Sequence, residues 1–288
     1  MQKVAIVTDS ACDITEELQR KWDINILNFA ITVDGNCYTE RVDFTPQQYY
    51  DILRTASGIP STAHITMFQF LELYGSYDEQ GYTDVILVTI NATGSATNDA
   101  AQLALRQFKA ENPESTLNVH IIDSRTYSFG YGGPVCRAAE MIAEGRPVEQ
   151  VITYLKDTFS RVEILLTAYT LKYIKQSGRV SAAAAFAGDL LGLRPIISLI
   201  DGESVVRSKV RGDKQVLPAL VRYAKDHKDG QTPYSIGTTN WENGERLAAL
   251  CEQEMGYPPE RVFYLGCAIT TNTGPDAIAI VYQGPSRG

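Results

Sequence analysis

A nearly continuous apolar run at residues 84–90, Asp-Val-Ile-Leu-Val-Thr-Ile, constrains the fold of this 288-residue chain more than any other stretch. A strand without polar alternation needs cover on both faces, as a strand inside a parallel sheet has. Further strand patterns fall at 4–8 and 117–123, and helical spacing fills 96–110 between two of them. This alternation of strands and helices predicts a parallel, doubly wound sheet.

Helix-start signals support that interpretation. Asp13 precedes a helical pattern, and its carboxylate is expected to cap the first turn. Thr45 and Pro46 are a good N-cap and first helical residue. Helical spacing also predicts helices at 68–77 and 132–144.

The regular alternation of strands and helices ends near residue 160. Strand patterns then fall at 163–167, 194–200, 204–210, 234–238, 262–268 and 277–282. Asp201-Gly202 is a tight-turn pair, which predicts a hairpin between the second and third of these strands. We therefore expect an N-terminal α/β domain at 1–160 and a C-terminal α+β domain with a mixed sheet at 161–288.

Composition excludes several function classes. The net charge of −8 argues against nucleic-acid binding and against a polybasic membrane surface. No apolar run reaches the roughly 18 residues of a membrane helix, and the alanine-rich run at 182–187 is too short, so no stable membrane insertion is expected. The N-terminus has no signal-peptide pattern, and the five cysteines are scattered. Both features predict a cytoplasmic protein with reduced thiols.

Three hydroxyl-rich segments are the main candidates for a binding site. They are Ser-Thr-Ala-His-Ile-Thr at 61–66, Asn-Ala-Thr-Gly-Ser at 91–95 and Asn-Thr-Gly-Pro at 272–275. Together they suggest a site of neutral hydrogen-bond donors, without metal ligands or a nucleophile. The segment 93–95 also precedes a helix, so it either faces an anion at the helix N-terminus or simply caps the helix.

An enzymatic reading stays open beside the binding one. Ser10, Ser124 and Thr93 carry hydroxyls near strand ends, and a hydrolase or an acyl or phosphoryl transferase would need one of them activated by a base. By position His64 is the candidate base, although a lone histidine is more often structural. No histidine pair has metal-ligand spacing, and there is neither a GxSxG elbow nor a nucleotide fingerprint. A sugar or nucleotide module therefore ranks lower.

Several short motifs, taken in order, resemble the DegV family of fatty-acid-binding proteins, whose bacterial members are FakB-like acyl carriers. The matching stretches are 6–10, 59–66, 93–95, 122–124 with 130–132, 171–180, 193–197 with 202, and 272–275. The stretch Leu-Lys-Tyr-Ile-Lys-Gln-Ser-Gly-Arg-Val at 171–180 is closest to a family signature. Each match is weak alone, but their joint order covers nearly the whole chain.

The resemblance implies a two-domain fold with one long-chain fatty acid buried in a tunnel between the domains, and no resident cofactor or metal. It implies a non-catalytic carrier that presents the fatty acid to a separate fatty acid kinase. Thr62 and Thr93 would bind the carboxylate, and the backbone near Ala63 and Gly94 would add donors.

The same resemblance implies that the segment Asn272, Thr273 and Gly274 closes over the head group, and that Arg179 is a candidate contact for the kinase, with a solvated surface charge as the alternative. The chain departs from the family pattern at three of the site positions. Thr93 replaces a serine and keeps the hydroxyl. Ala63 replaces a serine, and Asn272 replaces a histidine.

Overall fold

The apolar run at 84–90 forms β6 (Asp84–Thr89), a central strand of a four-stranded parallel sheet with the order β2-β1-β6-β7. The computed structural model describes residues 3–181 and 192–287, and the alanine-rich run at 182–187 lies outside them. Every residue of β6 is buried, as predicted. Its neighbours are β1 (Val4–Asp9), β2 (Asn25–Leu27) and β7 (Asn118–Asp123).

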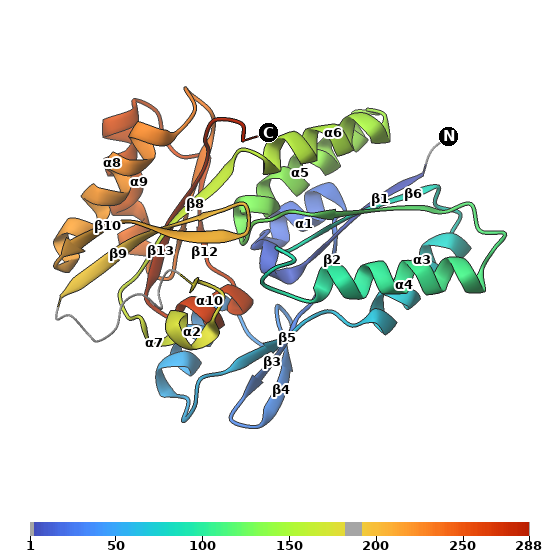
Figure 1. Cartoon of the computed structure of the whole chain (residues 1–288), viewed down its shortest axis with the longest axis horizontal. Helices are drawn as coiled ribbons and strands as arrows, with labels where there is room; N and C mark the ends of the chain where they lie inside the picture. Colours follow the sequence, from blue (N-terminus) through green and yellow to red (C-terminus); the bar gives the residue numbers. More distant parts are fainter. Residues whose placement is uncertain (1–2, 182–191, 288) are drawn as a thin grey trace.

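Helices cover both sides of this sheet (Figure 1). They are α1 (Glu16–Trp22), α3 (Met67–Glu79), α4 (Thr97–Glu111), α5 (Phe129–Ala143) and α6 (Val148–Phe159). The pair α3 and α4 lies on one side, and α5 and α6 lie on the other. The predicted doubly wound arrangement is thereby confirmed.

The C-terminal half forms a six-stranded mixed sheet with the order β10-β9-β8-β13-β11-β12. Its strands are β8 (Val162–Ala168), β9 (Leu193–Ile200), β10 (Glu203–Arg211), β11 (Tyr234–Thr238), β12 (Arg261–Tyr264) and β13 (Ala277–Gln283). The helices α8 (Val216–His227) and α9 (Trp241–Met255) pack against it. Asp201 and Gly202 both have positive φ, and the predicted hairpin is confirmed.

Alternation along the central strands of this sheet creates two different interiors. In β13, Ile278 and Ile280 join the core beneath α8 and α9. The intervening residues Ala279 and Val281 join the larger core shared with the N-terminal sheet. Because successive side chains of a strand point to opposite faces, the six-stranded sheet turns one apolar face toward the N-terminal half.

A small antiparallel sheet, β4-β3-β5, lies below the two large ones in Figure 1. Its strands are β3 (Ala30–Val33), β4 (Asn36–Thr39) and β5 (Ser61–Ala63). The neighbouring helices are α2 (Pro46–Thr55), α7 (Lys172–Ser177) and α10 (Cys267–Thr273). The chain also forms the 3-10 turns η1 (Ser10–Cys12) and η3 (Asp213–Gln215). Thr45 and Pro46 start α2 as predicted. No helix within the described ranges is long and apolar enough to cross a membrane.

Two local predictions were wrong, and one predicted helix starts earlier than expected. Thr15, not Asp13, caps α1, because the Asp13 carboxylate is held by partners far along the chain. The helix predicted at 132–144 begins three residues earlier, at Phe129. The strand predicted at 262–268 ends at Tyr264, and the residues after Gly266 form α10 instead.

Candidate functional site

A cavity of about 680 Å³ lies between the two large sheets, with β5 and α10 on its walls. Its wall is largely apolar and includes Phe29, Ile90, Ile164, Leu166, Leu199 and Val281. The last four come from the sheet face that β8, β9 and β13 turn toward the N-terminal half. A cavity of this size and lining suits a small apolar ligand with a few polar contacts.

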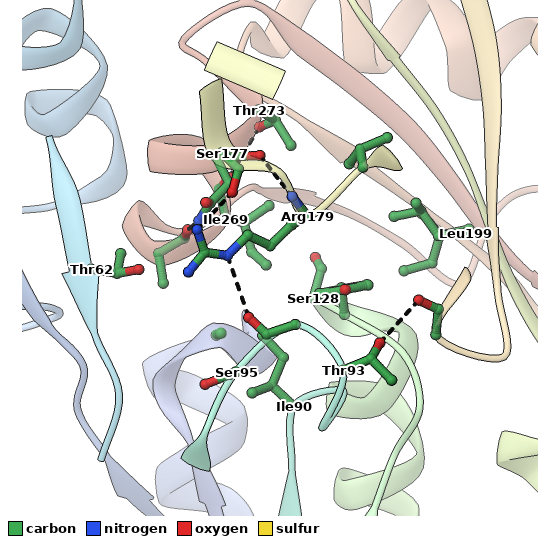
Figure 2. A pocket seen from close by; sticks show the side chains of 18 of the residues that line it. Thr62, Ile90, Thr93, Ser95, Ser128, Ser177, Arg179, Leu199, Ile269 and Thr273 are labelled. Atoms are coloured by element: carbon green, nitrogen blue, oxygen red, sulfur yellow. Dashed lines mark hydrogen bonds between the residues drawn. The ribbon is translucent and has the colours of Figure 1, made fainter. Parts of the chain in front are cut away.

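Most of the residues predicted from the sequence meet at this cavity. Thr62, Ala63, Thr93, Gly94, Asn272 and Thr273 all line it, and so does Arg179. Figure 2 shows Thr62 and Thr93 reaching it from different sides, with Arg179 between them in this view. Among the described residues, Gly274 is the predicted member that does not line the cavity.

Thr62 lies on β5, which the sequence suggested only as part of a loop. The strand pairs with β3, so that Thr62 is opposite Ile31. Its side chain is half-buried, and its hydroxyl has no hydrogen-bond partner within the described ranges. Thr62 therefore has an uncommitted donor at the cavity wall. Ala63 and His64 beside it are exposed.

Thr93 belongs to a denser cluster. Its hydroxyl donates to the Gly202 carbonyl oxygen at 3.3 Å and accepts from Asn91 Nδ2 at 2.9 Å. Asn91 is 1% exposed, and its Nδ2 also lies 2.7 Å from the Tyr127 hydroxyl oxygen. Ala96, not Thr93 or Ser95, is the N-cap of α4, and no side chain caps it. Neither Thr93 nor Ser95 is therefore the N-cap, although the Ser95 hydroxyl accepts from the amide of Thr97, the first residue of α4, at 3.3 Å.

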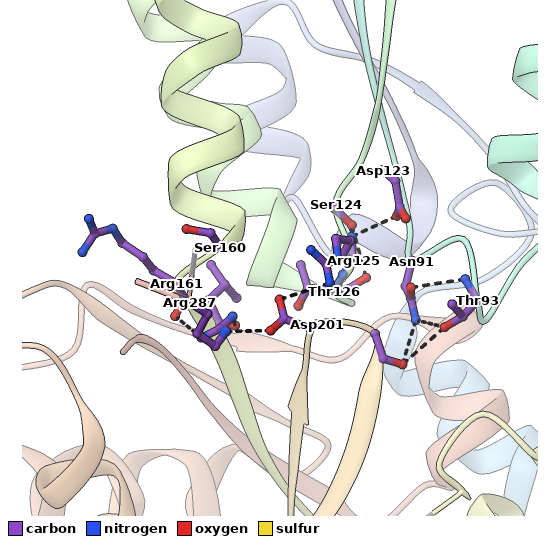
Figure 3. A network of polar contacts seen from close by, with 12 residues as sticks. Asn91, Thr93, Asp123, Ser124, Arg125, Thr126, Ser160, Arg161, Asp201 and Arg287 are labelled. Atoms are coloured by element: carbon purple, nitrogen blue, oxygen red, sulfur yellow. Dashed lines mark hydrogen bonds and ion pairs between the residues drawn. The ribbon is translucent and has the colours of Figure 1, made fainter. Parts of the chain in front are cut away.

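The hairpin turn at Asp201-Gly202 closes one side of the cavity. The carbonyl oxygen of Gly202 accepts from Asn91 Nδ2 at 3.2 Å as well as from Thr93. Asp201 forms ion pairs with Arg125 at 3.7 Å and with Arg287 at 2.8 Å (Figure 3). The tip of the C-terminal hairpin is thus fastened to loops that follow strands of the N-terminal sheet.

The end of α10 supplies wall atoms, and its polar side chains donate within their own helix, which leaves the second N–H of Asn272 unused among the described residues. Asn272 Nδ2 donates to the Ala268 carbonyl oxygen at 2.8 Å, and the Thr273 hydroxyl donates to the Ile269 carbonyl oxygen at 3.2 Å. Gly274 ends the helix with φ +91°, and a Cβ there would lie 2.7 Å from the Tyr173 ring. Glycine is needed at this position for conformation and space.

Arg179 is exposed and lies across the cavity wall toward Gly94. Its Nη1 donates to the Ser177 carbonyl oxygen at 2.6 Å, and its Nε lies 3.4 Å from the Gly94 carbonyl oxygen. Figure 2 shows both contacts. A guanidinium in this place gives the polar part of the cavity a positive charge.

Residues 3–284 match the family model described as an uncharacterised protein of the DegV family. The chain belongs to the DegV family. A DegV domain-containing protein of Caldanaerobacter subterraneus is 28% identical over 98% of this chain and 99% of its own length. The resemblance inferred from the motifs is confirmed.

Solved structures of DegV family proteins match the fold of this chain over nearly its whole length. The fatty-acid-binding DegV family protein of Streptococcus agalactiae is 25% identical, with a TM-score of 0.87, and the match covers 99% of this chain and 100% of that one. A Thermus thermophilus DegV family protein, described by its fatty acid binding, is 26% identical with a TM-score of 0.82 over 99% and 100% of the two chains. The predicted DegV-like fold is therefore confirmed.

A buried carboxylate cluster lies beside the cavity of this DegV-family chain, and no pattern in the sequence indicated it. Asp9, Asp13 and Glu40 are 1%, 6% and 1% exposed. Burial raises the pKa of Asp9 to about 7, and it also raises the pKa of Asp13 and of Glu40. In the sequence Asp13 was interpreted only as a helix cap, and no local pattern linked it to Asp9 or Glu40.

Internal donors satisfy these carboxylates. Asp9 accepts from the Ile90 amide at 2.8 Å and from the Tyr131 hydroxyl. Asp13 accepts from Ser128 and from the Gly266 amide, and Glu40 accepts from Ser10 and from the Ala268 amide at 2.7 Å. The cluster thereby joins the first strand to the beginning of α10. Within residues 3–181 and 192–287, no group of acidic, histidine or cysteine side chains is arranged to hold a metal ion.

The hydroxyls weighed as nucleophiles do not meet the proposed base. Ser10 is buried against Glu40, and Ser124 bonds within its own turn to Thr126. His64 Nδ1 lies 2.8 Å from the Ile65 carbonyl oxygen. In the described part of the chain, none of Ser10, Ser124 or Thr93 is hydrogen-bonded to His64.

Proposed function

We propose that this chain binds one long-chain fatty acid in the cavity, with the acyl chain in its apolar part and the carboxylate at the polar end. The observation that carries the proposal is the lining: one apolar wall that ends at Thr62, Thr93 and Arg179. Relatives described as fatty-acid-binding proteins share the fold over the whole chain. The cavity then serves as a tunnel between a domain at 1–160 and a domain at 161–288.

The physical chemistry of the ligand fits this lining. Removing a methylene from water contributes roughly 0.8 kcal/mol before the entropy cost of ordering the chain. A carboxylate is costly to bury unless several donors meet it. Thr62, Thr93 and the amides near Ala63 and Gly94 are candidate donors, and Arg179 supplies positive charge.

The chain is then a carrier, not a catalyst. It keeps the acyl chain out of water and presents the carboxylate to a separate fatty acid kinase, which forms the acyl phosphate. Arg179 is exposed beside the polar end, so its guanidinium is the proposed contact for that kinase. Asn272 and Gly274 act by shaping the end of α10 beside the head group.

Lipid analysis tests the binding step. Protein purified from cells is denatured, and the released lipid is identified by mass spectrometry. We expect about one fatty acid per chain. Protein that is empty and also fails to bind a fluorescent fatty acid would contradict the proposal. The kinase step is tested separately: loaded protein, a bacterial fatty acid kinase and ATP should yield acyl phosphate, and Arg179→Gln should slow its formation.

The head-group assignment has its own test. Thr62→Ala combined with Thr93→Val should weaken fatty-acid binding roughly ten- to hundredfold, because two donors to a charged group are lost. Affinity is measured by fluorescence titration, and thermal unfolding checks the fold. Thr55→Ala with Thr153→Val, at two exposed helix positions, is the matched control. Unchanged affinity in the cavity double variant would overturn the roles of Thr62 and Thr93.

A further inference from the structure

Tyr127 is the one tyrosine in the described ranges that lines the cavity. Its ring packs against the main core, and its hydroxyl oxygen lies 2.7 Å from Asn91 Nδ2. A Cβ at Gly94 would lie only 2.6 Å from that oxygen. The phenol oxygen therefore lies directly against the turn that holds Thr93 and Gly94, where a larger residue than glycine would displace it.

The orientation of Asn91 decides which way the Tyr127 hydrogen points. Asn91 Oδ1 accepts from the Thr93 amide at 3.2 Å, which leaves Nδ2 as the atom facing Tyr127. An amide N–H can only donate, so the Tyr127 oxygen accepts in this contact and keeps its own hydrogen. Within residues 3–181 and 192–287, that hydrogen has no acceptor.

The surroundings keep Tyr127 protonated and leave few competitors for its hydrogen. Burial raises the pKa of Tyr127, so the phenol remains a donor at neutral pH, while the Asn91 bond and the charge of Arg179 oppose that shift. The nearby Gly94 carbonyl oxygen already faces Arg179 Nε. A donor at a cavity wall without an internal acceptor is poised for a ligand acceptor.

We propose that the Tyr127 hydroxyl hydrogen-bonds the carboxylate of the bound fatty acid, and that Asn91 is the positioning residue that aims it. This inference rests on the proposed function. Thr93 and Tyr127 both lie within hydrogen-bond distance of Asn91 Nδ2, so one amide sets the place of two hydroxyls.

The proposed donor fills a gap left by other members of the site. Ala63 has no hydroxyl, and Asn272 and Thr273 donate to carbonyl oxygens of their own helix. Thr93 donates to the Gly202 carbonyl oxygen in this structure, although at 3.3 Å. Tyr127 instead offers a hydrogen that no described acceptor uses.

The test is the variant Tyr127→Phe, which removes the hydroxyl and keeps the ring. Binding of a long-chain fatty acid should weaken roughly ten- to hundredfold, as expected for a lost bond to a charged group. Binding of the alcohol of the same chain length should change by at most about threefold, because a neutral acceptor gains less from the hydroxyl. A purely structural role of Tyr127 would reduce the affinity for both ligands equally.

Tyr77→Phe is the matched control. Tyr77 also accepts from an asparagine amide, Asn25 Nδ2 at 2.9 Å, but it does not line the cavity. This variant should bind the fatty acid like the wild type. If the wild type itself binds no fatty acid, the proposed function fails. If the wild type binds and Tyr127→Phe binds equally well, only the role of Tyr127 is overturned.

A measurement on the unaltered protein covers the case in which Tyr127→Phe fails to fold. The tyrosines are labelled with ¹³C at Cζ, and their NMR signals are followed during titration. One signal should shift with the fatty acid and shift less with the alcohol, since Tyr127 is the tyrosine of the described chain at the cavity. Equal shifts with both ligands, or none, would overturn the proposal.

Discussion

Two polar clusters lie near each other in this molecule, one fully buried and one partly open to solvent at Thr93, and they differ in what they leave unsatisfied. In the carboxylate cluster of Asp9, Asp13 and Glu40, each side chain accepts from internal donors. In the hydroxyl cluster of Asn91, Thr93 and Tyr127, the Tyr127 hydrogen has no acceptor in the described part of the chain. A cluster that satisfies itself stabilises the fold, whereas one that retains a donor is suited to a ligand.

The largest expected difference is in stability. Glu40→Ala leaves the Ser10 hydroxyl and the Ala268 amide without their acceptor, in a site that is almost fully buried. We expect the free energy of unfolding to fall by about 3 kcal/mol, because unpaired buried donors are costly. Urea denaturation measures it.

The exposed Glu114→Ala is the control for Glu40→Ala and should have almost no effect. Tyr127→Phe should also unfold nearly like the wild type. Equal destabilisation by Glu40→Ala and Tyr127→Phe would erase the distinction between the two clusters.

The second largest expected effect is a pH dependence of the unfolding free energy that comes from the carboxylate cluster. Burial raises the pKa of Asp9 to about 7, although hydrogen bonds from Tyr131, Ile90 and Ala11 oppose the shift and the charge of Glu40 adds to it. Between about pH 4 and about pH 7 the folded chain therefore holds a proton that the unfolded chain has lost. The Asp9 contribution to stability is fully present below about pH 4 and is lost as the pH rises toward 7.

Asp9→Asn tests this sign. The amide cannot titrate, so the decline in stability between about pH 4 and about pH 7 should become shallower, by an amount on the order of a few kcal/mol. The variant should also be less stable at low pH, because its NH₂ group would face a donor such as the Ile90 amide. Urea midpoints measured across the range check both effects. An identical slope in the two proteins would contradict the raised pKa of Asp9.

The features that the sequence predicted correctly are those set by residues close together along the chain. Thr45 with Pro46, the Asp201-Gly202 turn and the buried run at β6 were predicted correctly because a few neighbouring residues determine each of them. The motif order then led to the family. Six of the seven predicted ligand residues line one cavity, although their binding roles stay predictions.

The wrong predictions fall where contacts with residues far along the chain determine the local structure. The apolar residues after Tyr264 looked like a continuing strand, but Asp13 and Glu40 accept amides of Gly266 and Ala268 and support a helix there. Asp13 looked like a helix cap, but Ser128 lies 115 residues away and holds it. Short apolar runs do not distinguish a strand from a buried helix.

Tyr127 was missed for the same reason. Its contact with Asn91 joins residues 36 positions apart, and no local pattern indicates which of the two groups donates. The side chain that leaves a donor for a ligand is recognised only after the partners of its neighbours are known. Pairing far along the chain therefore limits what the sequence alone predicts about the head-group site.

The smallest expected effect belongs to Arg179, whose charge lies at the cavity but remains exposed. Arg179→Gln should weaken fatty-acid binding roughly two- to fivefold at low ionic strength, and the difference should shrink in about 0.5 M salt, because solvent and ions screen an exposed charge. Lys175→Gln, an exposed position of α7 away from the cavity, changes the net charge equally. If both variants bind equally weakly, the effect reports the total charge of the protein; if only Arg179→Gln does, the guanidinium acts locally on the carboxylate.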